Sequence, residues 1–253
     1  MGRFASTVAY YESARPPYPD AFFAKVPGEL GFDRSQRLLD VGTGPGILAI
    51  GFAPYCLEVA GVDPEPAVIE AAREAAARVG VALELIEGRF EDMADGLGAF
   101  DVVTIGRALH WLDPEPARRP LERVVPPRGR ILVCGASSVK DARNPWLETF
   151  DAVRQRWSGE RPKRDHSAFF AGARFVQRGK NRVEASQSLP VERLVDRVLS
   201  MSTTSPERLG DEVPEMRNAI LGALAPFASG GVVEEFVEAQ AEVFEDRGES
   251  ADR

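Results

Sequence analysis

The chain has 253 residues, of which 44% are hydrophobic and 28% charged, and its formal net charge is −8. This length fits one large α/β domain or two small ones, and we predict a single domain over residues 1–253. The acidic balance speaks against a general binder of nucleic acid or of anionic membranes. No apolar run reaches the roughly 18 residues of a membrane span, and the start has no apolar segment typical of a secretory signal. We expect a cytoplasmic protein, because Cys56 and Cys134 lie inside apolar segments, as reduced buried thiols do.

Strand patterns alternate with helical patterns through the first half of the chain. A buried strand is expected where a short apolar run ends at a glycine or at Asp-Pro, and a helix where apolar residues repeat at helical spacing. The expected strands are residues 37–42, 58–64, 82–88, 100–106 and 130–136, and the expected helices are residues 47–55 and 67–80. This alternation predicts a parallel sheet with crossover helices, and the near-continuous apolar strands indicate that both faces are covered.

The second half of the chain has different hydrophobic patterns. Residues 174–189 alternate as an exposed strand does, and residues 191–201 and 213–227 have helical patterns. Residues 232–246 fit either a helix or a late strand, because their length suits a helix while their paired valines and phenylalanines suit a strand.

A basic segment covers residues 151–182, where nine basic residues stand against three acidic ones. Such a charge run is usually a solvated face, but it is also consistent with a basic wall that attracts an anionic substrate.

A glycine-rich turn carries the strongest chemical signal. Gly42, Gly44 and Gly46 stand between an expected strand and an expected helix, where the backbone must turn tightly and a ligand can approach without meeting a Cβ atom. A dinucleotide fingerprint would need glycine at the position of Ile47, and the carboxylate of Asp40 suits a pyrophosphate poorly. A dinucleotide-dependent oxidoreductase is therefore disfavoured.

Acidic and aromatic residues follow the next two expected strands. Asp63 ends the second strand, where its carboxylate can accept hydrogen bonds from both hydroxyls of a ribose or, in the structural alternative, cap the next helix. After the third strand, Phe90 and Met93 can wall a purine ring, and Glu91 or Asp92 can accept from its exocyclic amine.

Taken together, the segments "LLDVGTGPG", "GVDPEPAVIEAAR", "GRFED" and "FDVVTIGRALHWLD" resemble the class I S-adenosylmethionine-dependent methyltransferases in order and spacing. The resemblance implies an α/β fold with a doubly wound, mostly parallel, seven-stranded sheet (Rossmann-like), a reversed last hairpin, and hence a strand over 232–246. It also implies that Gly42 and Gly44 line the methionine end of the cofactor and that Asp40 lies near its amino group. Asp63 would hold the ribose hydroxyls, and Phe90 and Glu91 would flank the adenine. The implied cofactor-binding residues of this core are Asp40, Gly42, Gly44, Asp63, Pro64, Phe90, Glu91 and Gly106.

The start of the chain, "FASTVAYYESARPPYP", resembles small-molecule methyltransferases of the trans-aconitate methyltransferase type, as do "RALHWLD" and, more loosely, "LSMSTTSPERLGD". The resemblance implies a lid over residues 1–30, a cofactor-binding core over 31–140, an acceptor-side helical cap over 141–230 and a final strand over 231–247. Within the lid, Tyr11 and Tyr18 would close over the site and Arg15 would contact the cofactor carboxylate. The alternative is that both tyrosines only pack and that the Pro-Pro pair only stiffens the turn.

Two residues beyond the fourth strand are the candidate catalytic groups. His110 is a candidate base, because its ordinary pKa lies near neutrality, or else a positioning group. The guanidinium of Arg107 could pair with an acceptor carboxylate or phosphate, or with an acid of the protein itself. His166 could face the site from the cap, although surface packing is the more ordinary role. Two histidines and two scattered cysteines form no metal-ligand pattern, so no metal is expected.

The predicted function is methyl transfer from S-adenosylmethionine to a small-molecule acceptor that bears a carboxylate or a phenol. Two alternatives stay open: a cofactor-binding protein of the same fold that acts as a cyclase or regulator, and a nucleic-acid methyltransferase that uses the basic segment. The sequence leaves open the acceptor, the methylated atom and the oligomeric state.

Overall fold

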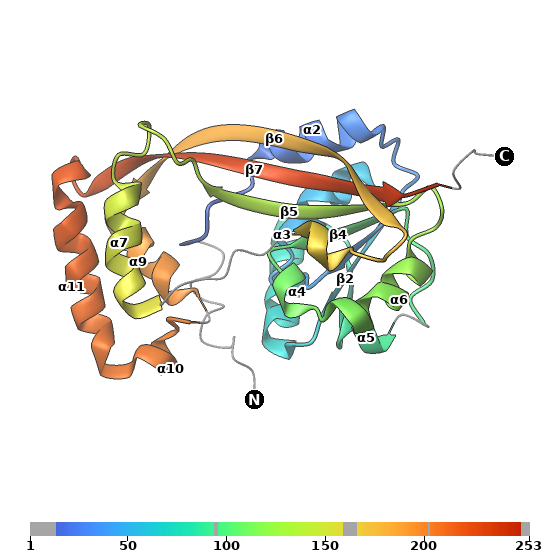
Figure 1. Ribbon diagram of the computed structural model, residues 1–253, viewed down its shortest axis with the longest axis horizontal. Helices are drawn as coiled ribbons and strands as arrows, with labels where there is room; N and C mark the ends of the chain where they lie inside the picture. Colours follow the sequence, from blue (N-terminus) through green and yellow to red (C-terminus); the bar gives the residue numbers. More distant parts are fainter. Residues whose placement is uncertain (1–13, 94–95, 159–165, 202, 249–253) are drawn as a thin grey trace. The chain divides into compact units, whose positions relative to one another are not determined.

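The computed structural model describes residues 14–93, 96–158, 166–201 and 203–248 of the chain (Figure 1). Its contacts divide the chain into two compact units. Unit 1 comprises Met1–Pro17, Ala136–Lys163 and Glu184–Ala239, and unit 2 comprises Tyr18–Gly135, Arg164–Val183 and Gln240–Arg253. The predicted lid, cofactor-binding core and cap end at residues 30, 140 and 230, and these boundaries differ from those of the two units. The division into lid, core and cap stays a prediction.

One seven-stranded sheet has the strand order β3-β2-β1-β4-β5-β7-β6. Its strands are β1 (Arg37–Val41), β2 (Glu58–Asp63), β3 (Glu84–Glu87), β4 (Val102–Gly106), β5 (Arg130–Ser138), β6 (Phe175–Pro190) and β7 (Val232–Asp246). The first five pair in parallel, with registers such as Leu39↔Ala60 and Asp40↔Thr104. β1 and β4 are buried almost throughout, as expected of strands covered on both faces. The predicted α/β fold class is confirmed.

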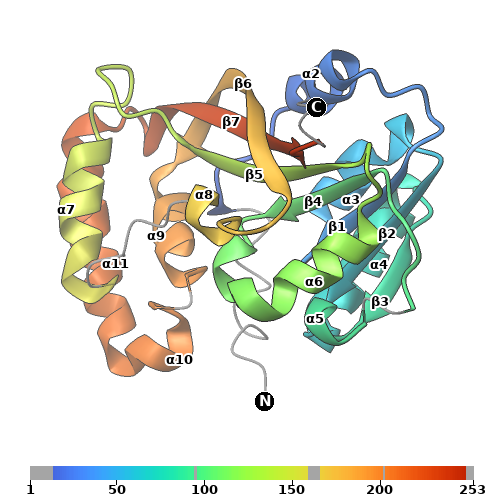
Figure 2. The same ribbon diagram turned by 45° about the vertical axis from the view of Figure 1, so that its right-hand side comes forward.

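The helices of unit 2 are α2 (Asp20–Leu30), α3 (Ile47–Phe52), α4 (Pro66–Val79), α5 (Phe90–Met93), α6 (Pro114–Val124) and α8 (His166–Phe169). The two helices predicted in unit 2, over residues 47–55 and 67–80, are present as α3 with the 3-10 turn after it and as α4. α4 starts with a proline in its first turn and ends at Gly80, which adopts the left-handed conformation with φ 69°. Helices α5 and α6 lie side by side (Figure 2). These crossovers bring the carboxyl ends of the parallel strands to one edge of the sheet.

Residues 232–246 form a strand, as the resemblance implies, and the burial of β7 alternates along its length. β7 runs antiparallel to β5, because Arg130 at the start of β5 pairs with Glu245 while Val139, just after β5, bonds to Phe236. β6 and β7 are antiparallel neighbours, because Gln187 reaches Glu235 and Lys180 reaches Glu242. The predicted reversal of the last strand is therefore confirmed, but β6 and β7 do not form a hairpin, since residues 191–231 with their helices connect them.

Unit 1 contains a second hydrophobic core. Its helices are α7 (Leu147–Ser158), α9 (Val191–Leu199), α10 (Pro206–Leu209) and α11 (Val213–Leu224). Helix α11 packs against both α7 and α9, around fully buried side chains such as Trp146, Leu194 and Ile220. The indole nitrogen of Trp146 donates a hydrogen bond to the carbonyl of Glu234 in β7, which satisfies its one polar atom.

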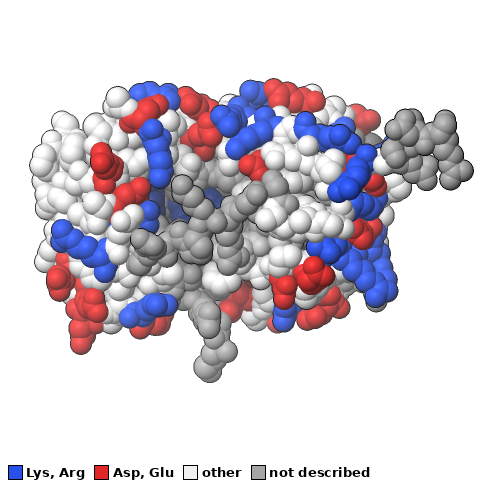
Figure 3. Space-filling view, viewed as in Figure 1, with Lys and Arg blue, Asp and Glu red and all other residues white. Residues whose placement is uncertain are grey.

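The described residues of the predicted basic segment are divided between the two units, and several of them form ion pairs. Arg154 pairs with Asp151 in unit 1, whereas Arg174 pairs with Asp246 in unit 2. On the face shown in Figure 3, cationic and anionic side chains lie interspersed. This distribution favours the solvated-face interpretation. Among the described residues, no helix is long and apolar enough to cross a membrane.

Candidate functional site

Three adjacent strands of unit 2 end at the central residues of the predicted site. β2, β1 and β4 are neighbours in the sheet, and their carboxyl ends carry Asp63, the glycine-rich turn and Gly106 respectively. An open α/β sheet binds its ligands at this edge. The fold therefore brings together residues that lie far apart in the sequence.

The glycine-rich turn is fixed by backbone hydrogen bonds to β2. The N–H groups of Gly42 and Thr43 donate to the carbonyl of Val62 at 2.9 and 3.1 Å. Gly42 and Gly44 both have left-handed φ angles, of 66° and 53°. A Cβ atom at Gly42 would lie only 2.5 Å from the Cβ of Ala108, whereas one at Gly44 would meet nothing within 4 Å. Gly42 is thus required by packing, while Gly44 presents an open backbone face to a ligand.

Asp63 connects β2 to this turn. Its Oδ2 accepts the backbone N–H of Gly44 at 3.0 Å, and its Oδ1 accepts the backbone N–H of Glu65 at 3.0 Å. Burial raises the pKa of the Asp63 carboxyl, and these two hydrogen bonds oppose the rise. Asp63 does not cap the following helix, because α4 has Glu65 at its N-cap position and no side-chain cap. The carboxylate is half-buried, so it can still face a ligand.

Asp40 lies beneath the protein surface and is only 2% exposed. Its oxygens accept hydrogen bonds from the hydroxyls of Thr43 at 2.8 Å and of Thr104 at 2.6 Å. Burial raises the pKa of Asp40 to about 6, while the bonds from Thr104 and Thr43 act in the opposite direction. Asp40 therefore offers little exposed surface to a cofactor amino group, and that contact stays a prediction. Its side chain also supports the glycine-rich turn through Thr43.

Neither threonine is among the residues that the sequence motifs single out. Thr104 is the only polar side chain in the run "VVTIG" of β4, which is the signal that could have revealed it. A buried hydroxyl needs a hydrogen-bond partner, and parallel pairing places Thr104 directly opposite Asp40.

Phe90 and Glu91 differ from the prediction in how much surface they offer. The Phe90 side chain is 3% exposed and belongs to the hydrophobic core, so its exposure does not support stacking on an adenine. The Glu91 side chain is 7% exposed and lies 3.7 Å from the guanidinium of Arg89. It borders a surface hollow of about 330 Å³ between α5 and α6, whose other lining residues are Asp92, Glu115, Pro116, Arg119, Pro120 and Arg123.

Tyr18 and Arg107 meet at the end of β4. The guanidinium carbon of Arg107 lies 4.9 Å from the centre of the Tyr18 ring, within the range of a cation–π contact. A Cβ atom at Gly106 would lie 3.7 Å from the Tyr18 hydroxyl oxygen, so the ring covers this strand end. Arg107 has a φ of 57°, which costs a non-glycine residue roughly 1–2 kcal/mol. Its N–H donates to the carbonyl of Cys134, which holds this strained turn in place.

His110 and Trp111 follow in a short 3-10 helix, η2 (Leu109–Trp111). Both are exposed, with Trp111 at 48%, and their rings lie 4.8 Å apart. His166 instead lies 3.1 Å from a carboxylate oxygen of Glu242 in β7, which supports the packing role.

The remaining predicted residues lie elsewhere. Arg15 belongs to unit 1, where its Nη2 donates to the carbonyl of Ser200 at 2.9 Å, and its contact with a cofactor stays a prediction. Pro64 is exposed in the bend after β2. Tyr11 lies outside the described residues.

Similarity to known proteins establishes the family. The Methyltransferase domain family matches residues 39–133. A protein of Mycobacterium tuberculosis named as an uncharacterized methyltransferase is 31% identical over 209 residues, which cover 81% of this chain and 80% of that protein. The chain belongs to the methyltransferases.

Solved structures of other methyltransferase-like proteins share the fold. The YcgJ protein from Bacillus subtilis is 20% identical, with 90% of this chain and 98% of that chain covered and a TM-score of 0.56. A SAM-dependent methyltransferase from Thiobacillus denitrificans, solved in complex with S-adenosyl-L-homocysteine, is 17% identical, with 98% and 99% covered and a TM-score of 0.56. At these identities the likeness shows the fold alone.

The matched domain of this methyltransferase contains the glycine-rich turn, Asp40, Asp63 and the end of β4, whereas Tyr18 lies outside it.

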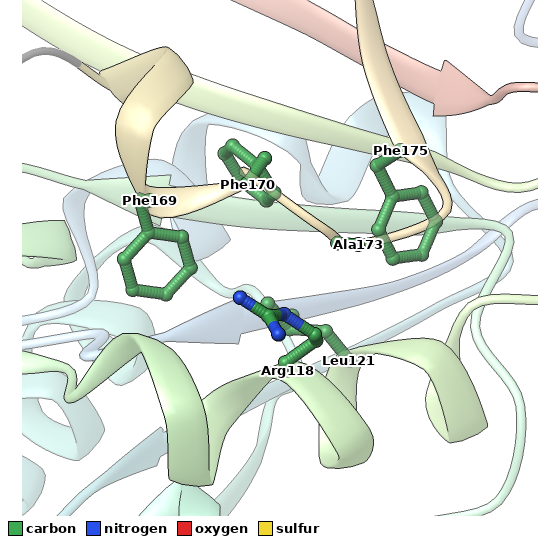
Figure 4. Close-up of a pocket in the computed structure, with 6 residues that line it drawn as sticks. All are labelled: Arg118, Leu121, Phe169, Phe170, Ala173 and Phe175. Atoms are coloured by element: carbon green, nitrogen blue, oxygen red, sulfur yellow. The ribbon is translucent and has the colours of Figure 1, made fainter.

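A separate hollow of unit 2 surrounds Arg118, which Figure 4 shows among Phe169, Phe170 and Phe175. The Nη2 of Arg118 donates to the carbonyl of Ala171 at 2.6 Å, and the hollow leaves no room even for a water molecule. It contains no predicted site residue, and we interpret it as packing.

Proposed function

We propose that this methyltransferase transfers the methyl group of S-adenosylmethionine to a small-molecule acceptor. The observation that carries the proposal is the pairing of Asp63 with Gly44 at the carboxyl edge of the sheet. A half-buried carboxylate suits a ribose diol, and the open backbone face of Gly44 leaves space for the rest of the nucleoside.

The charges of the site also suit this cofactor. S-adenosylmethionine carries a positive sulfonium and an amino group. Asp63 lies close enough to Asp40 to influence its titration, and Glu91 follows the neighbouring strand. Carboxylates partly removed from water attract a cationic ligand more strongly than exposed ones do. The residues present therefore fit the cofactor.

The cofactor supplies an activated methyl group, so the chain itself must align the acceptor, exclude water and remove a proton where the acceptor carries one. We assign His110 to proton removal or to acceptor positioning, since it is exposed just beyond β4. Trp111 stacks against it and offers an apolar surface to the acceptor.

We further propose an anionic acceptor and membership of the branch that resembles trans-aconitate methyltransferases. The support is Arg107, whose strained backbone places a guanidinium beside Tyr18 at the end of β4. Strain of this kind clusters at functional sites. The N-terminal lid over 1–30, the cap over 141–230 and a cytoplasmic location belong to the same proposal.

The first experiment is a calorimetric titration of the purified protein with S-adenosylmethionine and with its demethylated product. We expect binding near the micromolar range, or about −8 kcal/mol. Labelled cofactor should then deliver methyl to members of a panel of small carboxylates and phenols. Binding without transfer to any acceptor would favour the cyclase or regulator alternative, and salt-sensitive RNA binding would favour a nucleic-acid acceptor. Absence of cofactor binding would contradict the proposal.

Replacing Arg107 with alanine tests the acceptor assignment. We expect the KM for an anionic acceptor to rise about tenfold or more, because a charge-assisted hydrogen bond is lost. The affinity for S-adenosylmethionine should change by less than about threefold, which corresponds to less than 1 kcal/mol of binding free energy. Steady-state kinetics and calorimetry measure the two quantities separately. Equal losses of both would contradict the acceptor role.

A further inference from the structure

Thr104 lies in the central strand β4 of unit 2, and its side chain is 0% exposed. Its hydroxyl donates to Oδ1 of Asp40 at 2.6 Å, and parallel pairing sets the two residues opposite each other. A buried hydroxyl costs free energy unless it is bonded, whereas valine would fill nearly the same shape without that cost. The threonine therefore calls for an explanation, and its bond to Asp40 is where that explanation starts.

The Asp40 carboxylate receives hydrogen bonds from three directions. Oδ1 accepts from Thr104, Oδ2 accepts from the hydroxyl of Thr43 at 2.8 Å, and the backbone N–H of Ala49 in α3 supplies a third bond. Asp40 and Thr43 are only 2% and 5% exposed. The carboxylate thus connects β4 and α3 to the glycine-rich turn from beneath, and all of these contacts lie within unit 2.

Thr43 belongs to the glycine-rich turn and is held on every side. Its backbone N–H donates to the carbonyl of Val62 at 3.1 Å, and its carbonyl accepts from the N–H of Gly46 at 3.0 Å. Its side chain lies against Gly61, where a Cβ atom would come within 2.8 Å of the Thr43 hydroxyl oxygen. Gly61 is also the β2 partner of Asp40 in the sheet register. The missing side chain at Gly61 therefore leaves the space that Thr43 uses to reach Asp40.

The residue after Thr43 is Gly44, whose N–H donates to Oδ2 of Asp63 at 3.0 Å. Two carboxylates thus hold the same turn, Asp63 through the Gly44 N–H and Asp40 through the Thr43 hydroxyl. A binding segment that is already held in one conformation loses less entropy when its ligand binds, and it binds more tightly for that reason.

We propose that Thr104 is a positioning residue of the cofactor site, which holds the Asp40 carboxylate toward Thr43 and thereby fixes the glycine-rich turn. The inference rests on the proposed function, since this turn is the one that would receive S-adenosylmethionine. Thr104 is fully buried, so it acts through Asp40 and not by touching the cofactor.

The test removes the Thr104 hydroxyl in Thr104→Val, which keeps the branched shape and suits a buried strand. Thr104→Ala also removes the hydroxyl and adds no bulk, so the test does not depend on how valine packs. Thr104→Ser keeps the hydroxyl and should behave as wild type does. The control is Ile131→Val, which trims a fully buried side chain at the start of β5, the end remote from the glycine-rich turn. Thermal unfolding establishes that each variant is folded.

Hydrogen exchange and calorimetry are the first two readouts. Without cofactor, exchange at the amides of Thr43 and Gly44 should accelerate when the hydroxyl is removed and stay at the wild-type rate in Thr104→Ser and Ile131→Val. The Kd for S-adenosylmethionine at pH 7 should rise about five- to tenfold in the hydroxyl-deleted variants alone, because a hydrogen bond to a charged group is lost. Wild-type exchange and Kd in a folded hydroxyl-deleted variant would overturn the inference, and so would equal changes in Ile131→Val.

A double variant tests the route through Thr43. Thr43→Ala removes the hydroxyl at the other oxygen of Asp40 and should give the same faster exchange and weaker binding. If Thr104 acts through Asp40 on Thr43, combining Thr43→Ala with Thr104→Val should raise the Kd no further than the larger single change, because both break one shared connection. Fold-changes that multiply would show two independent effects and would overturn the inference.

The pH dependence of binding separates positioning from packing. The bond from Thr104 lowers the pKa of Asp40, so its loss lets the carboxyl keep its proton to higher pH. Binding should therefore improve more steeply between pH 6 and pH 8 in Thr104→Val than in Thr104→Ser. The titratable groups that face Asp40 are Asp63 of β2 and Cys134 of β5, while α3 and β4 contain none. Both variants keep those two groups, so the difference between them reports Asp40, and parallel profiles would overturn the inference.

The exchange measurement also separates this inference from the proposed function. If the wild-type protein does not bind S-adenosylmethionine, the proposed function fails. Exchange at the Thr43 and Gly44 amides then still decides whether Thr104 fixes the turn: faster exchange in Thr104→Val but not in Thr104→Ser supports it, and equal exchange overturns it.

Discussion

Replacing Asp63 with alanine is expected to weaken the binding of S-adenosylmethionine roughly 100-fold or more, because two hydrogen bonds to a charged group are lost at once. The carboxylate also holds the N–H of Gly44 at 3.0 Å, so the variant loosens the turn that forms the rest of the cofactor site. Calorimetric titration at pH 7 measures the affinity, and thermal unfolding shows whether the variant is folded.

Two variants locate the source of the Asp63 effect. Asp63→Asn keeps an oxygen for the Gly44 N–H but removes the charge, and its affinity should fall between those of wild type and alanine. Glu58→Ala removes an acid from the opposite end of the same strand, where the side chain is 62% exposed, and should bind as wild type does. A folded Asp63→Ala protein with wild-type affinity would place the cofactor elsewhere.

Replacing Asp40 with asparagine is expected to change how stability depends on pH. Burial raises the pKa of Asp40 from 3.8 to about 6, so the folded state holds this proton more tightly than the unfolded chain. The unfolding free energy of the wild type therefore falls as pH rises from about 4 to about 6, and then levels. From pH 4 to pH 7 this loss amounts to ~2–3 kcal/mol.

The asparagine variant lacks this titration. Its stability relative to wild type should rise by ~2–3 kcal/mol between pH 4 and pH 7, as measured by urea unfolding at each pH. The amide can still exchange hydrogen bonds with the hydroxyls of Thr43 and Thr104, which act as donors or acceptors. Asp211→Asn, at an exposed position in unit 1, is the control and should track wild type. A constant difference between Asp40→Asn and wild type would mean that the pKa of Asp40 is the same in the folded and unfolded states.

The same carboxyl links pH to the cofactor. A bound cation near Asp40 favours its charged form, so S-adenosylmethionine should bind more tightly at pH 7 than at pH 5, and this dependence should be smaller in Asp40→Asn. The result would show that the buried carboxylate acts on the cofactor through its charge.

Local signals in the sequence determined the order of the elements and the methyltransferase motifs. Glycines, Asp-Pro and apolar periodicity mark the ends of β1, β2 and β4, because backbone conformation at a turn depends on the few residues that form it. For this reason the residues alone predict that the glycine-rich turn and Asp63 lie at one edge of the sheet. The strand over 232–246 needed the family resemblance, since its residues alone suit two conformations.

Tertiary structure decided how much surface each of the marked side chains exposes. Asp40 is turned into the protein by Thr43 and Thr104, and Phe90 enters the core, although both belong to motifs that predict a ligand contact. The sequence alone does not reveal that Arg197 pairs with Glu235, because the two residues lie 38 positions apart and only the fold brings them together. Burial and pairing arise from contacts between distant segments, and a local pattern does not contain those contacts.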